Sequence, residues 1–564
     1  MRRLYSVLIV LLVWHSFALA RVPDQQIRID IIEKIPNQPR SFHVRDWYAA
    51  AYEFDRLAFD LGARGKHMPL VFTLEYGDIR GFGLPCYVGD YRRRGNDDAP
   101  RHNEAIATLG AMLGASFVGI DKSIGPINWV EWCTQYYANG PGEGVIVNDP
   151  VERPAKSHWY VLFPNVLYLG LCDLYPEAQG IQSIADKVCR RWLEVARVLT
   201  DQGRHPDFNQ TGFDFKAMKP VTNDHWKEPD SGAALAWLMH AAYRRSVQQG
   251  DERTAQDYLA AVDWCLRFYQ ERKQNPAYEI LLPFGVYTAA RMNAEQGRNY
   301  DMKKLLGWVY DRSAARPTMI MIADTWAGRD VHGLMGFTKP KNTEQGYAFT
   351  MNTFATAWPI VPIARYDDRF ARTIGKWMLG AAHAARYFYP AEHAPSFQTN
   401  PEWQADPWNV IAYEGLRQKW MRPDEPLTAG GDPLSYGWGP ETDLGVYGSS
   451  YVGVFGAIVK KTNHERILRL DLLVTDLYRD RAYPTYLYFN PYVEARDVAV
   501  ELGDQIVDVY DAVSNHFLRR RVKGRCYVTV PADAPVVLVL TPPGKRISTE
   551  GTKRLVDGVV IDYR

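Results

Sequence analysis

The chain has 564 residues, of which 46% are hydrophobic and 13% aromatic, including 17 Trp and 34 Tyr. Its 66 Lys and Arg residues nearly balance 65 Asp and Glu residues, giving a formal net charge of +1. This balance argues against nucleic acid as a partner, because nucleic-acid-binding proteins usually carry a basic surface. The length and the apolar content predict two or three domains with sizeable cores.

Residues 1–20 have the features of a secretory signal peptide. A basic start at Arg2 and Arg3 precedes an apolar run over residues 8–13, and residues 18–20 supply small side chains at a cleavage position. The apolar run is too short for a membrane span, and no later run approaches the necessary length. We therefore expect a mature protein that is exported to the periplasm or the extracellular space and has no membrane span.

The six cysteines are spread too thinly for a disulfide scaffold or a zinc cluster. Buried free thiols are therefore expected. One bridge, between Cys172 and Cys189 on neighbouring predicted helices, stays open as an alternative. The exported location would permit it.

Helical periodicity dominates from about residue 46 onwards. Apolar residues at a spacing of three to four predict amphipathic helices over 178–200, 231–249, 254–272 and 368–388. Further helices are expected over 46–62, 103–117, 157–175, 278–297, 302–312, 346–364 and 406–420. No fixed period is present, which disfavours an array of sequence repeats. Helix pairs that close into a ring would satisfy the count without a period.

The pattern changes near residue 465. Short β-branched and aromatic runs with alternating polarity follow, separated by Gly, Pro, Asn and Asp. They predict an antiparallel β-sandwich over residues 465–564. A single sheet layered directly on the helical domain is the alternative.

A signal peptide, about twelve helices and a C-terminal β module together resemble the six-hairpin (α/α)6-toroid glycosidases and the related polysaccharide lyases. The segments Trp326–Gly333 and Glu344–Asn352 look like the loops at the rim of such toroids. The resemblance implies a mainly α fold, with a toroid over residues 21–464 and the β-sandwich after it. It also implies saccharide chemistry on loops at one end of the ring.

Five polar segments are candidates for that site. The first, residues 75–104, is Gly-rich and mixed in charge, and its Arg80 suits bidentate pairing with a uronate or sulfate. A solvated surface loop is the alternative. The second precedes a predicted helix: Trp226 offers a face for sugar stacking, while Glu228 or Asp230 acts on the glycosidic oxygen. For Asp230, a helix cap is the alternative to catalysis.

In the third segment, Glu279 stands at the front of an otherwise apolar helix, where a raised pKa would suit a general acid. A simple interaction with the helix dipole is the alternative. The fourth segment runs between helices, and we expect substrate contact there rather than metal binding, since one Asp-x-His pair is a weak metal signal. Its candidates, with those of the neighbouring loop, are Asp324, Trp326, Arg329, Asp330, His332, Glu344, Tyr347 and Asn352.

The fifth segment supplies Tyr413 and Glu414, and the Gly-rich stretch after it supplies Trp438 and Tyr447. These residues would line a cleft between the helical and β parts, or belong to a plain connecting loop.

The sequence thus predicts a secreted glycoside hydrolase that cleaves an oligosaccharide or polysaccharide without a cofactor or metal. Its acid and base are expected among Asp230, Glu279, Asp324, Asp330 and Glu414. One alternative is a polysaccharide lyase that uses Tyr347, Asn352, His332 and Arg329 on a uronate. Another is a non-catalytic glycan-binding surface protein.

Overall fold

The computed structural model describes residues 26–76, 79–90, 103–150, 154, 156–316, 319–338, 346–398, 400–419, 428–430, 438 and 440–563. The expected signal peptide lies outside the described residues. Within them, no helix combines the length and the apolar character that crossing a membrane requires.

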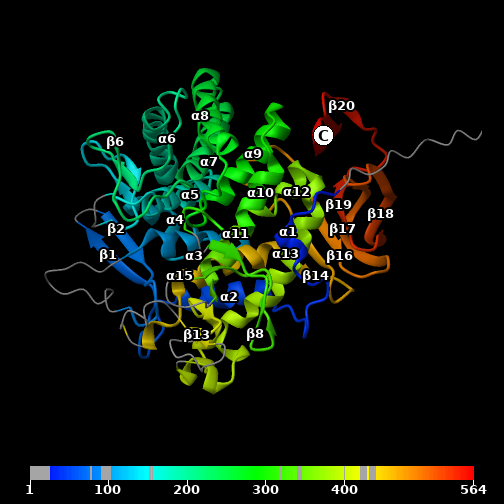
Figure 1. Ribbon diagram of the computed structural model, residues 1–564, viewed down its shortest axis with the longest axis horizontal. Coiled ribbons are helices and arrows are strands. Elements are labelled where there is room, and N and C mark those ends of the chain that lie inside the picture. Colours follow the sequence, from blue (N-terminus) through cyan, green and yellow to red (C-terminus); the bar gives the residue numbers. More distant parts are fainter. Residues whose placement is uncertain are drawn as a thin grey trace, which may run out of the picture.

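Most of the long helices lie where periodicity predicts them. Their bounds are α2 (Trp47–Ala58), α3 (Ala105–Phe117), α5 (His158–Leu174), α6 (Gln179–Leu199), α7 (Ser231–Gln248), α8 (Glu252–Glu271), α9 (Leu282–Gln296), α10 (Met302–Tyr310), α11 (Thr350–Ile360) and α13 (Ala371–Ala384). Shorter helices are α1 (Asp30–Glu33), α4 (Trp129–Trp132), α12 (Ile363–Tyr366), α15 (Val446–Ser449) and α16 (Val452–Ile458). Figure 1 shows α6 to α9 side by side in the upper part of the molecule.

Short strands interrupt the helical part. Four two-stranded hairpins are β1 (Phe72–Tyr76) with β2 (Ile79–Gly83), β3 (Tyr137–Ala138) with β4 (Val145–Ile146), β5 (Gly212–Asp214) with β6 (Lys219–Val221), and β8 (Thr325–Trp326) with β9 (Arg329–Asp330). An antiparallel five-stranded sheet has the order β13 (Thr428–Gly430), β12 (Gly415–Arg417), β11 (Gly346–Phe349), β10 (Met335–Thr338), β7 (Met319–Met321).

The predicted fold class, a toroid followed by a sandwich, is wrong. The protein is 41% helical and 21% strand over its described residues, a mixed α/β fold with several small sheets. The segment 406–420, predicted as a helix, instead contains β12, and the predicted helix 346–364 begins as β11. A glycine explains part of this: a Cβ on Gly415 would collide with the ring of Tyr347, so the two strands approach closely only because residue 415 has no side chain.

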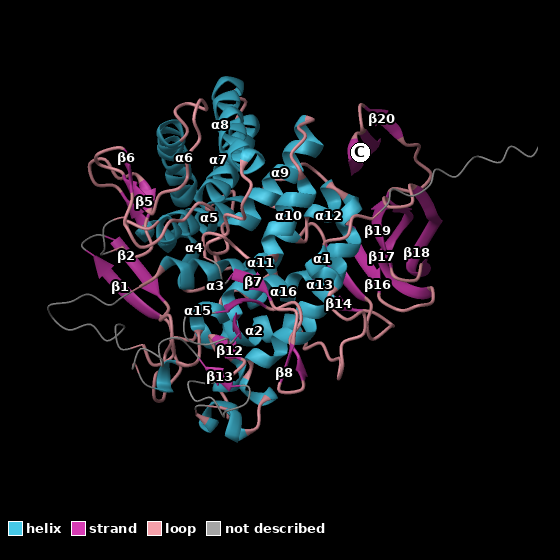
Figure 2. Cartoon of the chain, viewed as in Figure 1, coloured by secondary structure: helices cyan, strands magenta, loops and turns pink. Residues whose placement is uncertain are grey.

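The C-terminal part is a sheet on helices rather than a two-sheet sandwich. One antiparallel sheet has the order β14 (Val459–Lys461), β15 (Leu468–Asp471), β16 (Thr485–Asn490), β19 (Ala534–Thr541), β17 (Arg496–Asp511), β18 (His516–Val530). Helix α13 packs on β16 and β19, and Phe489 and Val537 join the same hydrophobic core as the helices. Figure 2 shows this sheet gathered at one end of the molecule. The alternative of one sheet layered on the helical part therefore describes this region.

Two further features complete the fold. A separate three-stranded sheet of β20 (Ser548–Glu550), β21 (Lys553–Val556) and β22 (Val559–Tyr563) ends the described chain. All six cysteines are buried and free, so Cys172 and Cys189 do not form the bridge left open above.

Candidate functional site

Four helices begin at or beside one cavity of about 310 Å³. Glu104 immediately precedes α3, Trp159 lies in the first turn of α5, Glu279 precedes α9 by three residues, and Asn352 lies in the first turn of α11. Because the start of a helix carries partial positive charge, this convergence favours carboxylates in the cavity. The lining residues are Cys86, Tyr87, Glu104, Trp159, Tyr160, Glu279, Arg316, Phe349, Met351, Asn352, Glu414, Trp438, Tyr447 and Gly448.

Glu414 is held by two phenol groups. The hydroxyl of Tyr87 donates to Oε1 at 2.9 Å and that of Tyr347 donates to Oε2 at 3.2 Å. Burial, and next the adjacent Glu414 carboxylate, raise the pKa of Tyr87 well above its usual value, so this phenol remains a proton donor. Two O–H donors stabilise the charged form of the carboxylate between them.

Glu279 is held by a cation and an amide. It forms an ion pair with Arg316 and accepts a hydrogen bond from Nδ2 of Asn352 at 3.2 Å. The guanidinium of Arg316 lies 5.3 Å from the ring centroid of Tyr278, so this arginine contacts both the carboxylate and an aromatic face. Helix α9 begins at Leu282, which places Glu279 on the preceding loop rather than in the first turn.

Glu104 is the third carboxylate of the cavity. It is buried, and its Oε2 accepts from Nδ2 of Asn148 at 3.1 Å. Burial raises the pKa of Tyr447 well above its usual value, and the nearby Tyr160 and Glu104 add to this effect. Glu104 belongs to the polar segment 75–104, from which Arg80 was the residue predicted to bind substrate.

Asp230 and Glu228 lie behind the cavity wall. Asp230 makes no capping hydrogen bond to α7, although it precedes Ser231; its Oδ2 accepts instead from the backbone N–H groups of Tyr278 at 3.0 Å and Glu279 at 2.9 Å. Burial raises the pKa of Asp230 to about 8, because the two hydrogen bonds offset only part of the lost hydration. The alternative of a side-chain cap is therefore wrong for Asp230. Asp230 was also a candidate catalytic acid, but it does not line the cavity and is placed instead to hold the loop that carries Glu279.

Glu228 holds the start of α5, which carries the lining residue Trp159. Its carboxylate accepts from Oγ of Ser157 at 2.7 Å, from the backbone N–H of Trp159 at 2.6 Å and from Nε1 of Trp226 at 2.9 Å. Burial raises the pKa of Glu228 even though these donors act in the opposite sense. Trp226 is 41% exposed and does not line the cavity.

The fourth predicted segment does not reach this cavity. Asp324, Trp326, Arg329, Asp330 and His332 lie on or beside the β8–β9 hairpin, and none of them lines it. Four of them contact one another: Asp324 accepts from Nε1 of Trp326 at 3.0 Å, and Nδ1 of His332 hydrogen-bonds to Asp330. Arg329 instead lies over the rings of Tyr387 and Phe397. Burial would raise the pKa of Asp330, but the hydrogen bond from His332 lowers it overall. In the part of the chain that the structure describes, no three His, Cys, Asp or Glu side chains are grouped to hold a metal ion.

The remaining predicted residues are dispersed. Arg80 is exposed on β2, and the buried Tyr413 donates its hydroxyl to Oε1 of Gln398 at 2.7 Å rather than facing the cavity. Glu344 lies outside the described residues. Tyr347 does not line the cavity itself but contacts two residues that do, through its hydrogen bond to Glu414 and through its ring, 4.4 Å from that of Phe349.

Sequence reasoning missed several lining residues. Trp159 and Tyr160 open a predicted helix, and two aromatic side chains at a helix start next to polar loops were a usable signal. Tyr87 and Arg316 gave no such signal, because each reaches its glutamate from a segment remote in the sequence.

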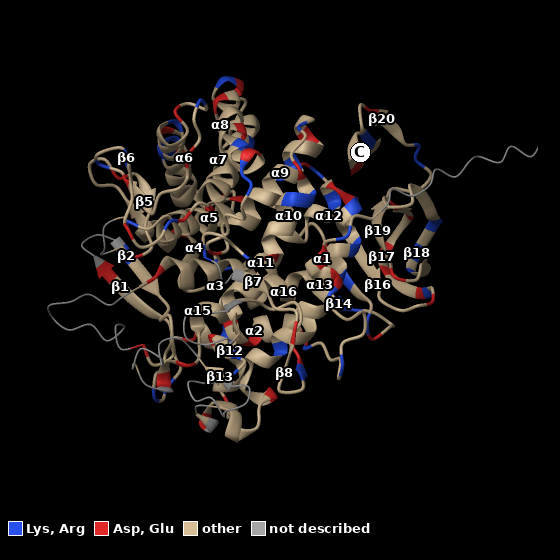
Figure 3. Ribbon diagram, in the orientation of Figure 1, with Lys and Arg blue, Asp and Glu red and all other residues tan. Residues whose placement is uncertain are grey.

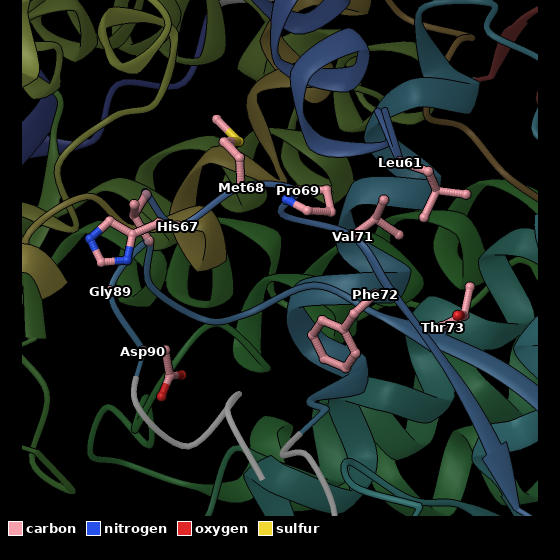
Figure 4. Close-up of a pocket in the computed structure, with 10 residues that line it drawn as sticks. Leu61, His67, Met68, Pro69, Val71, Phe72, Thr73, Gly89 and Asp90 are labelled. Carbon is pink, nitrogen blue, oxygen red and sulfur yellow. The ribbon is translucent and has the colours of Figure 1, made fainter. Parts of the chain in front are cut away.

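A second cavity, of about 520 Å³, adjoins the same stretch of chain. Cys86 and Tyr87 line the first cavity, whereas Val88, Gly89 and Asp90 line the second. Figure 4 shows His67, Met68, Pro69 and Phe72 around it. Its lining has one carboxylate, Asp90, and is otherwise mostly apolar, so it lacks the three glutamates and the Trp and Tyr side chains of the first cavity. A further cavity of about 560 Å³ has three carboxylates, Glu53, Asp60 and Asp406, but no Trp or Tyr in its lining.

Comparison of the sequence with models of protein families and with curated proteins finds no match. A functional proposal for this chain therefore depends on the residues that the fold brings together.

Proposed function

We propose that the protein is a glycoside hydrolase that cleaves an oligosaccharide or polysaccharide in the cavity at the starts of α3, α5, α9 and α11. One observation supports this above the others: three glutamates, Glu104, Glu279 and Glu414, share a cavity with Trp and Tyr side chains. Aromatic faces suit the apolar faces of sugar rings, and paired carboxyl groups suit acid and base catalysis. A volume of about 310 Å³ accommodates a small ligand such as one or two sugar units.

The surroundings of the three glutamates suggest their roles. Hydrolysis of a glycosidic bond needs one protonated carboxyl group to assist the leaving oxygen, and one charged carboxylate to activate water or attack the anomeric carbon. Glu414 fits the charged role, because two phenols donate to it. Glu279 is also held charged by Arg316. We assign proton donation to the buried Glu104.

The lyase alternative has less support. Of its candidates, Asn352 lines the cavity and Tyr347 bonds to the lining residue Glu414, but His332 and Arg329 lie on or beside the β8–β9 hairpin and do not line the cavity. A lyase would need a base and a group that neutralises the uronate at one place. The predicted export of the chain is consistent with either enzyme and is retained as part of the proposal.

The test combines a substrate panel with three isosteric variants. Reducing-end release and ultraviolet absorbance of unsaturated products are measured on neutral, amino and uronate glycans. Glu104→Gln, Glu279→Gln and Glu414→Gln should each lower kcat by about 10²–10⁴-fold, since each removes an acid, a base or a charge. Asp324→Asn is the matched control, because this exposed carboxylate lies outside the cavity and should leave kcat unchanged.

Each alternative gives a different result. Unsaturated products would replace the hydrolase by the lyase. Saturable glycan binding without turnover, unaffected by the three Gln variants, would indicate a binding protein. Equal loss of activity in Asp324→Asn and in the Gln variants would place the reaction elsewhere.

A further inference from the structure

The outermost strand of the C-terminal sheet is strongly basic. β18 is the last strand in the sheet order, and among the described strands it pairs only with β17. Over residues 519–525 it carries five exposed cationic side chains, which we call the basic strip: Arg519, Arg520, Arg521, Lys523 and Arg525. Figure 3 shows Lys and Arg along β18 at the end of the molecule distant from α6 and α8.

Only part of this charge is neutralised. Arg520 pairs with the buried carboxylate of Asp508 at 2.7 Å, and Arg525 pairs with Glu501 at 2.6 Å. The other three basic side chains of the strip form no ion pair with any described residue. One exposed carboxylate, Asp504, lies in the part of β17 opposite Lys523. The strip therefore keeps an excess of positive charge in a protein whose total charge is close to zero.

Asp508 also fixes the shape of this region. Its Oδ1 accepts from the backbone N–H of Arg521 at 2.7 Å, and its Oδ2 accepts from the backbone N–H of Gly544 at 2.8 Å. These bonds hold the turn after β19, at Gly544, against the strip. The strip is thus a built part of the sheet edge rather than a set of independent surface side chains.

We propose that the basic strip binds an acidic polysaccharide. Successive residues of a strand are about 3.3 Å apart, so residues 519 to 525 extend over at most roughly 20 Å. The backbone is irregular at Arg521 (φ 50°) and Gly524 (φ 72°), where the register against β17 shifts, so the cations form a bent row along the sheet edge. A flexible linear polyanion can follow such a row. Tyr527 is 52% exposed and alternation places it on the same face as Arg525, where its ring offers an apolar surface for a sugar. The strip is distinct from the cavity lined by the three glutamates, so this binding is independent of the proposed hydrolysis.

The test measures binding to heparin, with dextran as the neutral counterpart and vesicles containing phosphatidylglycerol as a second anionic probe. Arg519→Gln/Arg521→Gln/Lys523→Gln removes the three unpaired cations. Lys216→Gln/Lys219→Gln/Lys227→Gln makes the same change in net charge at exposed lysines around β5 and β6. Thermal unfolding of both variants verifies that the fold is retained.

Wild type and the lysine control should bind heparin with the same Kd, and the strip variant should bind roughly tenfold or more weakly. The slope of log K against log salt should fall by about 2–3 in the strip variant, because fewer counterions are released. Equal weakening in both triple variants would show that only net charge matters and would overturn the proposal. So would equal binding to dextran, or binding to the vesicles without binding to heparin. Absence of heparin binding by wild type would also overturn the proposal. The charges of the strip would then serve to prevent pairing of this edge strand with a strand of another molecule.

Discussion

The buried carboxyl group of Asp230 should control how stability depends on pH. The pKa of an aspartate in an unfolded chain is about 3.9, whereas burial raises that of folded Asp230 to about 8. Between these values the folded protein binds a proton that the unfolded chain has released. The free energy of unfolding therefore falls as pH rises, by about 1.4 kcal/mol per pH unit. From pH 5 to pH 8 this amounts to about 4 kcal/mol.

Asp230→Asn removes this dependence while its side-chain oxygen still accepts from the N–H groups of Tyr278 and Glu279. Urea unfolding followed by tryptophan fluorescence, at several pH values between 5 and 8, gives the free energy of each protein. The difference between variant and wild type should grow in favour of the variant by about 4 kcal/mol across this range. Other titrating groups cancel in the difference.

Two further variants sharpen the test. Asp230→Ala leaves two buried N–H groups without their acceptor, which should lower stability by about 2–4 kcal/mol at pH 5. Glu228→Gln removes a negative charge that helps to raise the pKa of Asp230. The fall in stability with rising pH should therefore end at a lower pH in this variant. A difference between Asp230→Asn and wild type that is constant from pH 5 to pH 8 would refute the reasoning.

Two other predictions concern the core. Glu295→Gln should lower stability by about 3–5 kcal/mol at pH 7, because the fully buried Arg291 loses its charged partner at 2.8 Å. Burial opposes ionisation of Glu295, but Arg291 lowers the pKa of this carboxyl overall. The stability that the charged Glu295 contributes should therefore be lost as pH falls below about 4. Urea unfolding should show this loss in wild type and not in Glu295→Gln. Gly415→Ala should cost about 1–3 kcal/mol, because the new Cβ collides with the ring of Tyr347. Gly307→Ala is the control: its Cβ meets nothing within 4 Å in α10, and thermal unfolding should show a gain of about 0.5–1 kcal/mol.

The helices were predictable because their signal is local. A stripe of apolar residues identifies α6 and α8 to within two residues at either end, whatever they pack against. The five-stranded sheet was not predictable in this way, since its strands have three or four residues and pair across gaps such as Tyr347 to Arg417. The segment 406–420 has helix-like apolar spacing, but tertiary pairing determines its structure instead.

The candidate site was predictable to the same partial extent. Glu279, Asn352 and Glu414 were found because each is a polar residue beside an apolar segment. Their partners Arg316 and Tyr87 were missed, since only the folded chain brings them together. A search for polar loops thus finds the carboxylates, whereas the hydrogen bonds and ion pairs that set their charge depend on contacts of long sequence separation.

The segment 226–230 illustrates how catalysis and support are divided. Polar residues at a helix start suggest either a cap or an active site, yet here the carboxylates accept from the backbone of the first turn of α5 and of the loop before α9. Glu228 holds the start of α5 and Asp230 holds the loop before α9, so one short segment fixes the separation between Trp159 and Glu279 on the two walls. A buried carboxyl that accepts from backbone N–H groups restricts the loop more than a flexible surface contact does, because leaving those groups unpaired costs about 1–3 kcal/mol each. The density of charge in this segment therefore follows from the need to hold the walls of the cavity in place.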